Sequence, residues 1–191
     1  MGAAHSQSLV DAASGVRYVF EREPAVRFLS MRSSRVVTFA LWVGRIALAA
    51  TLLSAVADRF GLWGPYGSPR ASWGDWAHFV AYCGVVNSFA PKAVIPALAW
   101  IATVLETVFG VGLLIGYKLE YVAYGSAVLF ALFALAMTWS GGIKDPLNYS
   151  VFADAGGALL LGALVSVTKS EGRSERGSYS VADAGARWAE D

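Results

Sequence analysis

The order of apolar and polar residues divides most of the chain into four long apolar segments separated by shorter polar stretches. The segments are Val36–Ala57, Ala93–Tyr117, Tyr121–Ser140 and Pro146–Thr168. Each is about as long as the roughly 20 residues that an α-helix needs to cross the core of a bilayer. The third segment has no charged residue, and each of the others has one. The pattern therefore predicts an all-α integral membrane protein, a bundle of four transmembrane helices.

The longest polar stretch connects the first two apolar segments. Its first part, Gly61–Pro69, is rich in turn-forming glycine and proline, which predicts an irregular loop. The second part, Ser72–Val86, has apolar residues three to four positions apart, which is typical of a helix. We expect it to lie on the outer membrane surface as an interfacial helix. Within it His78 is either a proton donor beside Asp75 or an ordinary interfacial residue, and Cys83 is expected to pack as a small apolar side chain.

The basic residues predict how the chain is oriented. Eleven of the 15 lysines and arginines fall on the side that carries both termini. The other side has only four: Arg59, Arg70, Lys92 and Lys144. The positive-inside rule then places both termini in the cytoplasm. Residues 1–35 are expected to form a basic cytoplasmic tail with an amphipathic segment at Pro24–Arg35, residues 36–168 the membrane domain, and residues 169–191 a disordered cytoplasmic tail.

Composition agrees with this organisation and removes other classes of protein. The 191 residues are 56% hydrophobic and 15% charged, so four such helices would leave too little polar surface for a soluble protein. A net charge of +1 gives no reason to expect a nucleic-acid partner. The single cysteine excludes an internal disulfide, and the sequence has no metal-ligand cluster or nucleotide-binding motif. The lipid bilayer is the first partner that the sequence predicts.

Two of the charges inside apolar segments are candidate catalytic residues. Counted from the cytoplasmic ends of their segments, Arg45 and Glu106 lie at nearly the same depth, so an ion pair between them is expected. Three interpretations are open. The pair fixes the register of two helices, or Glu106 is a carboxylate that handles protons beside Arg45. In the third, Arg45 extends to the cytoplasmic headgroups.

A second polar group is expected near the outer ends of the helices. Asp154 lies inside the fourth segment, close in sequence to Asn148 and Tyr149. Together with Arg59 and Trp139 these residues are candidates for a pocket that binds a quinone headgroup, which needs hydrogen-bond partners at that depth. The competing interpretation is that they cap helices and form salt bridges among exposed end groups.

The second apolar segment resembles a known family. Glu106–Gly116, followed at once by the hinge Tyr117–Glu120, is similar to the DoxX family of small four-helix membrane proteins. Three other places support the resemblance: Arg45, Ala57–Gly61 and Gly142–Asp154. It covers roughly Val36–Val167. Where family members often have a lysine after the first helix, this chain has Arg59, whose planar fork differs from a point charge.

The resemblance implies a subunit of the bacterial inner membrane associated with redox chemistry. One branch of the family is similar to the small subunits of a thiosulfate:quinone oxidoreductase. The implied role is an accessory or quinone-facing subunit that works with a redox partner protein, rather than an enzyme by itself. Two alternatives remain: a homo-oligomeric transport protein in which Arg45, Glu106 and Asp154 mark a polar path, and a membrane scaffold without chemistry.

Overall fold

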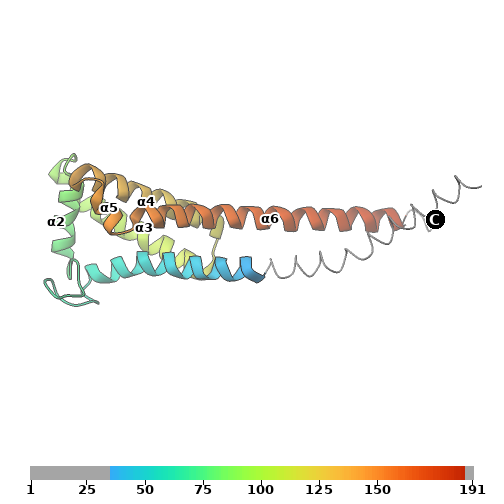
Figure 1. The fold of residues 1–191 in the computed structure, drawn as a ribbon, viewed down its shortest axis with the longest axis horizontal. Coiled ribbons are helices and arrows are strands. Elements are labelled where there is room, and N and C mark those ends of the chain that lie inside the picture. The colour runs from blue at the N-terminus through green and yellow to red at the C-terminus, as the bar shows by residue number, and fades with distance from the viewer. Residues whose placement is uncertain (1–34, 188–191) are drawn as a thin grey trace, which may run out of the picture. The chain divides into compact units, whose positions relative to one another are not determined.

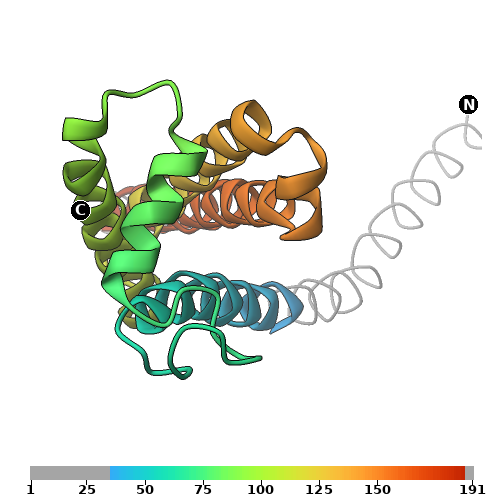
Figure 2. The same ribbon diagram turned by 90° about the vertical axis from the view of Figure 1, so that its left-hand side faces the viewer.

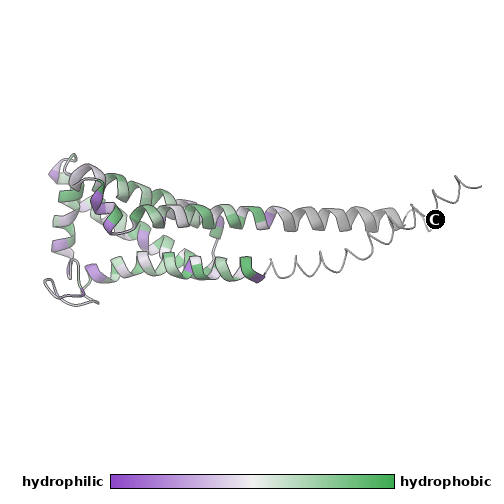
Figure 3. Cartoon of the chain, viewed as in Figure 1, coloured by the Kyte–Doolittle hydropathy of each residue, from purple (hydrophilic) through white to green (hydrophobic). Residues whose placement is uncertain are grey.

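The computed structural model describes residues 35–187, with side chains as far as Ser170 (Figure 1). In this part of the chain, four helices are long and apolar enough to cross a membrane. They are Arg35–Arg59, which we call the first span, Lys92–Ile115, Leu119–Gly141 and Val151–Ser170. Hydrophobic residues recur along all four of them, with hydrophilic residues at a few positions (Figure 3). The predicted all-α fold is confirmed, and the chain is a multi-pass membrane protein that contacts lipid.

The remaining elements follow the loop after the first span. They are α2 (Trp76–Val86), the 3-10 helix η1 (Lys92–Val94), α3 (Ile95–Ile115), α4 (Leu119–Gly141), α5 (Lys144–Asn148) and α6 (Val151–Arg187). The chain divides into two units between Trp42 and Val43, and the second unit holds all the helices after the first span. Within that unit α2 runs across the ends of the spans (Figures 1 and 2). We call this end of the bundle the α2 end, and the opposite end, at Tyr117–Lys118, the hinge end.

Local chemistry explains where several helices begin and end. The side chain of Asp75 accepts a hydrogen bond from the His78 backbone N–H (2.9 Å) and so caps α2. Proline in the first turn of α3 costs no hydrogen bond. Gly116 ends α3 in the left-handed conformation (φ 73°), which glycine adopts without a steric penalty. Lys118 follows with φ 41°, so the chain reverses within the hinge and α4 runs back beside α3.

Two of the predicted boundaries are corrected. The fourth span begins at Val151 rather than Pro146, because Lys144–Asn148 forms the separate helix α5 and Ser150 interrupts the helix with a φ of 57°. Beyond Lys169 the expected disordered tail is helical as far as Arg187. No proline, the residue that interrupts a helix most strongly, follows Pro146. The predicted basic tail, except Arg35, lies outside the described residues, as do residues 188–191.

Glycines let the spans of the second unit approach closely. A Cβ at Gly110 of α3 would lie 2.7 Å from Leu53 Cγ of the first span. On α6, a Cβ at Gly162 would lie 2.9 Å from the Tyr124 ring of α4. Such close packing replaces the hydrophobic driving force, which is weak between helices in lipid. The contact at Gly110 also sets the register of the first span against α3.

Filling the space at Gly110 should destabilise the bundle. The expected cost of Gly110→Leu is the typical overpacking penalty of about 1–3 kcal/mol, or a melting temperature roughly 3–10 °C lower. Gly156→Leu is the matched control, because a Cβ at Gly156 meets nothing within 4 Å. Thermal unfolding in detergent, followed by tryptophan fluorescence, measures both. Equal melting temperatures for the two variants would contradict the packing described here.

Candidate functional site

A buried ion pair lies inside the bundle near the α2 end. Arg59 Nη2 is 2.5 Å from Glu106 Oε2, and the two side chains are only 2% and 4% exposed. Arg59 is the last residue of the first span, and Glu106 lies in the middle of α3. The guanidinium therefore turns back into the bundle. The two atoms are in ion-pair contact, although Oε2 lies outside regular hydrogen-bond geometry.

Other groups hold the Arg59 guanidinium in place. Its Nη1 donates a hydrogen bond to Thr103 Oγ1 (2.6 Å), and that hydroxyl donates to the Ala99 carbonyl (2.8 Å). The Phe79 ring of α2 covers the guanidinium at 3.7 Å, and the Trp73 ring lies 5.4 Å away. Aromatic faces attract cations, most strongly where water is excluded. The guanidinium is thus enclosed by α3 on one side and by aromatic rings on the other.

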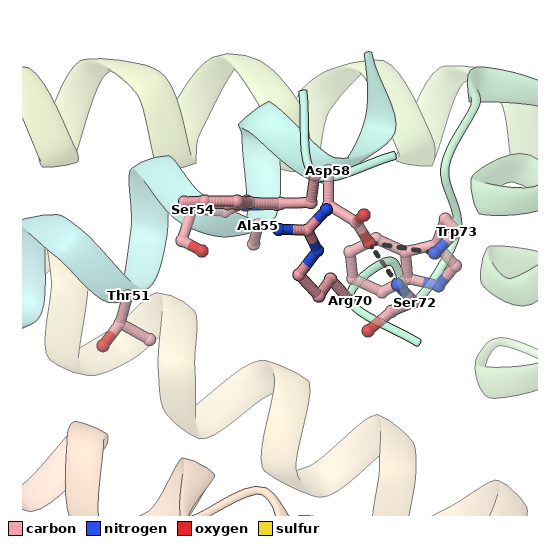
Figure 4. A pocket seen from close by; sticks show the side chains of 8 residues that line it. Thr51, Ser54, Ala55, Asp58, Arg70, Ser72 and Trp73 are labelled. Atoms are coloured by element: carbon pink, nitrogen blue, oxygen red, sulfur yellow. Dashed lines mark hydrogen bonds between the residues drawn. The ribbon is translucent and has the colours of Figure 1, made fainter. Parts of the chain in front are cut away.

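Asp58, the residue before Arg59, points toward the loop that precedes α2 rather than into the bundle. Asp58 Oδ2 accepts hydrogen bonds from the backbone N–H groups of Ser72 and Trp73, both at 2.9 Å (Figure 4). These bonds tie the loop before α2 to the end of the first span, and they position the Trp73 ring near Arg59. Asp58 is 4% exposed, and its Oδ1 has no hydrogen-bond partner among the described residues. The consecutive residues Asp58 and Arg59 therefore organise the loop and the bundle interior respectively.

Helix α2 covers this site with an apolar face. Phe79 and Cys83 pack with Ile95 and Ala99 of α3. Burial raises the pKa of the Cys83 thiol to about 11, since Glu106 adds to the effect and Arg59 only partly opposes it. The thiol is therefore protonated at neutral pH and packs as an apolar side chain, as expected from the sequence. On the same helix, burial raises the pKa of Tyr82 to about 12.

The other titratable group of α2 lies at the surface. His78 Nδ1 is 2.8 Å from Asp75 Oδ2, and the imidazole stacks on the Tyr66 ring with centroids 3.5 Å apart. The His78 backbone N–H, followed by its side chain, holds the pKa of the Asp75 carboxyl below its usual value. These contacts fix the loop Gly61–Pro69 to α2 and do not reach the buried pair.

The predicted pairing of Arg45 with Glu106 is wrong. Arg45 Nε and Nη2 donate to the carbonyl oxygens of Leu113 and Leu114, both at 2.9 Å. These carbonyls belong to the last turn of α3, where backbone acceptors have no partner within the helix and a cation is favourable. The prediction counted depth from the ends of apolar segments, but the packing at Gly110 shifts the register so that Arg59 reaches Glu106. Arg45 therefore extends toward the hinge end of the bundle.

The five residues predicted to hold a quinone headgroup do not meet in one site. The contacts of Arg59 are with α2, its preceding loop and α3. Trp139 is 75% exposed, Tyr149 is 69% exposed, and Asn148 is also exposed. Asp154 is half-buried in the first turn of α6, where its backbone N–H bonds the Ser150 carbonyl (3.0 Å). All five are near one end of the bundle, but sequence position does not determine the face of a helix on which a side chain lies.

Thr103, Phe79 and Trp73 surround the pair, and none of them was predicted as a site residue from the sequence. Thr103 precedes Glu106 by three positions and therefore lies on the same face of α3, which was a usable signal. Phe79 belongs to a separate helix, and no local pattern predicts that its ring covers Arg59. Comparison with family models, with curated proteins and with solved structures finds no match for this chain.

The chemistry available at the site is that of a carboxylate held by a guanidinium in an apolar interior. Such a carboxylate can hold or release a proton, and the protein controls that step by the distance between the two charges. In the part of the chain that the structure describes, no three His, Cys, Asp or Glu residues form a group suited to a metal ion. The arrangement is that of a buried charge pair.

Neutralising only one member of the pair should be more harmful than replacing both. Glu106→Gln leaves Arg59 as an unpaired buried charge, with an expected loss of about 3–5 kcal/mol in the free energy of unfolding. The double variant Arg59→Met/Glu106→Leu should be within about 1 kcal/mol of the parent, because apolar side chains of similar size replace both charges. Unfolding by SDS titration measures each variant. The control is Glu120→Gln, at the partly exposed Lys169–Glu120 contact (3.3 Å), where the free energy of unfolding should change little because solvent screens the pair. A double variant as unstable as Glu106→Gln would refute this account of the pair.

Cys83 should be almost unreactive in the folded protein. With a pKa of about 11, only about one thiol in a thousand is ionised at pH 8, and the side chain is also buried. We expect alkylation by a maleimide to be at least about a hundredfold slower in mild detergent than after unfolding in SDS. Because the chain has a single cysteine, intact-mass measurement counts the label directly. Equal labelling rates in the two states would show that α2 does not cover the thiol.

Proposed function

We propose that this chain is a DoxX-like accessory subunit of an oxidoreductase assembly in the bacterial inner membrane. In this proposal both termini are cytoplasmic, and a partner protein supplies the electron-transfer centres. The chain contributes a membrane-embedded proton site, which consists of Glu106 held by Arg59. The observation that carries the proposal is the enclosure of this pair between α3, Phe79 and Trp73.

The cost of burying the pair supports a role beyond packing. Each buried ion loses several kcal/mol of hydration, and two apolar side chains of the same volume would fill this space without that loss. Ionisable residues within membrane spans are rare for the same reason, and a function is their usual explanation. Glu106 fits a proton site better than the other two charges of the apolar segments. Arg45 bonds the carbonyls at the end of α3, and Asp154 lies at the start of α6.

An accessory role is favoured over a quinone-facing one. The residues predicted to bind a quinone are separated into a buried arginine, a half-buried aspartate and three exposed side chains, so we derive no step through a quinone. A proton site within the span has a clear use in a redox assembly, because electron transfer to or from a membrane carrier is commonly balanced by protons.

The charge distribution supports the proposed orientation. Of the four basic residues of the α2 end, Arg59 is buried in the pair, whereas Arg70, Lys92 and Lys144 are exposed. The α2 end therefore exposes three basic residues rather than four. This makes the difference in positive charge between the two ends of the bundle larger, as the positive-inside rule requires for the proposed orientation. The hinge end carries Lys118 and Lys169.

The double variant Arg59→Met/Glu106→Leu tests the proposal. The parent, purified from its native membrane in mild detergent, should copurify with a flavin-, haem- or thiol-dependent enzyme that mass spectrometry identifies. The double variant should bind this partner equally, but electron transfer by the complex should fall about a hundredfold or more, as for loss of a general acid or base.

The matched control is Glu120→Gln, which removes a carboxylate from the hinge end and should leave the rate within about twofold. Absence of a redox enzyme from the purified complex would refute the subunit role. A fully active complex with the double variant would show that the pair is structural.

A further inference from the structure

An open hollow lies on the surface of the second unit, beside the end of the first span. Its volume is about 540 Å³, within the range of about 300–1,000 Å³ that is typical of small-molecule sites. The first span contributes a helical stripe that ends at Asp58, and the following loop contributes aromatic and polar groups. The principal lining residues are Ser54, Asp58, Trp63, Arg70, Ser72 and Trp73 (Figure 4).

The hollow contains one buried acceptor without a partner. Asp58 is 4% exposed, and its Oδ2 is occupied by the N–H groups of Ser72 and Trp73. Its Oδ1 has no hydrogen-bond donor among the described residues. A buried carboxylate oxygen without a donor is costly, and a cation that donates hydrogen bonds is the partner that best removes this cost.

The same hollow contains a cation at its rim. Arg70 is exposed, and within the described part of the chain it forms no ion pair with Asp58 or any other carboxylate. Its guanidinium is turned toward the first span (Figure 4). A guanidinium binds phosphate through parallel hydrogen bonds. The hollow therefore presents an anion for an ammonium group and a cation for a phosphate group.

Its position indicates a ligand from the membrane. Asp58 is at the end of a span, which is the depth of the lipid headgroups. Trp63 is 46% exposed and donates its indole N–H to the Ser54 carbonyl (3.0 Å), so its ring lies against the span at this level. Tryptophan favours this interfacial depth because one edge is polar and the rest is apolar.

We propose that the hollow is a binding site for a lipid headgroup that joins a primary ammonium to a phosphate, as in phosphatidylethanolamine. The ammonium donates to Asp58 Oδ1, the phosphate accepts from Arg70, and the acyl chains follow the stripe of the first span toward Thr51. A quaternary ammonium has no N–H, so phosphatidylcholine cannot satisfy Asp58 in this way. This site is separate from the Arg59–Glu106 pair and does not depend on the proposed redox function.

Native mass spectrometry of the full chain in detergent tests the proposal. Phosphatidylethanolamine and phosphatidylcholine with the same acyl chains are added to the parent, to Arg70→Gln and to Ser54→Phe, which fills the hollow. Arg70 is exposed, so its replacement should not disturb folding. The parent should bind phosphatidylethanolamine about tenfold more tightly than phosphatidylcholine, and both variants should lose most of this preference. Lys144→Gln, at an exposed lysine of α5, is the control and should bind like the parent.

Three outcomes would overturn the proposal. Equal binding of the two lipids to the parent, or an unchanged preference in Arg70→Gln, would mean that Asp58 and Arg70 do not recognise this headgroup. Soluble phosphoethanolamine is the second probe, because it carries the same charges without acyl chains. If it displaced the lipid at equal concentration, the site would bind the free headgroup and the lipid assignment would be wrong.

Discussion

The contact between Arg59 and Glu106 is the constraint on which the α2 end of the bundle depends. Two charges in an apolar interior cost several kcal/mol each unless their partners are well placed. The first span must therefore present Arg59 at the depth of Glu106, and the close approach of Leu53 to Gly110 allows this register. Thr103 Oγ1 then accepts a hydrogen bond from Arg59 Nη1 and the Phe79 ring covers one face of the guanidinium, while Nε has no hydrogen-bond partner among the described residues. The register set at Gly110 and the aromatic cover from α2 together allow this one pair to form.

The charged contacts at the hinge end of the bundle are partly exposed, whereas the Arg59–Glu106 pair at the α2 end is buried. At the hinge end, Arg45 bonds carbonyls at the end of α3, and Lys169 meets Glu120 3.3 Å away at a partly exposed position. Charges there cost little, because headgroups and water solvate them. At the α2 end the pair is enclosed beneath a helix that crosses the spans. The unequal cost of the two arrangements is the reason to look for function at the α2 end.

The four spans could be predicted from the sequence because length and hydropathy determine which segments can cross a bilayer. That Glu106 has a charged partner could also be predicted, since a carboxylate in such a segment is costly without one. The identity of this partner could not be predicted. A membrane helix is apolar on all sides, so its pattern gives neither its rotation nor its register, and Arg45 was as reasonable a partner as Arg59. For the same reason, the sequence does not determine on which face of the bundle Trp139, Tyr149 and Asp154 lie.

Trp73 lies between the open hollow and the buried Arg59–Glu106 pair. Its backbone N–H bonds Asp58, its side chain lines the open hollow, and its ring lies 5.4 Å from the Arg59 guanidinium. A ligand on Asp58 Oδ1 therefore acts on the carboxylate that positions Trp73, and Trp73 in turn covers the cation that holds Glu106. Because Asp58 and Arg59 are consecutive residues, displacement of one backbone segment alters both contacts. The occupancy of the hollow and the environment of the buried pair are thus physically linked through a single side chain.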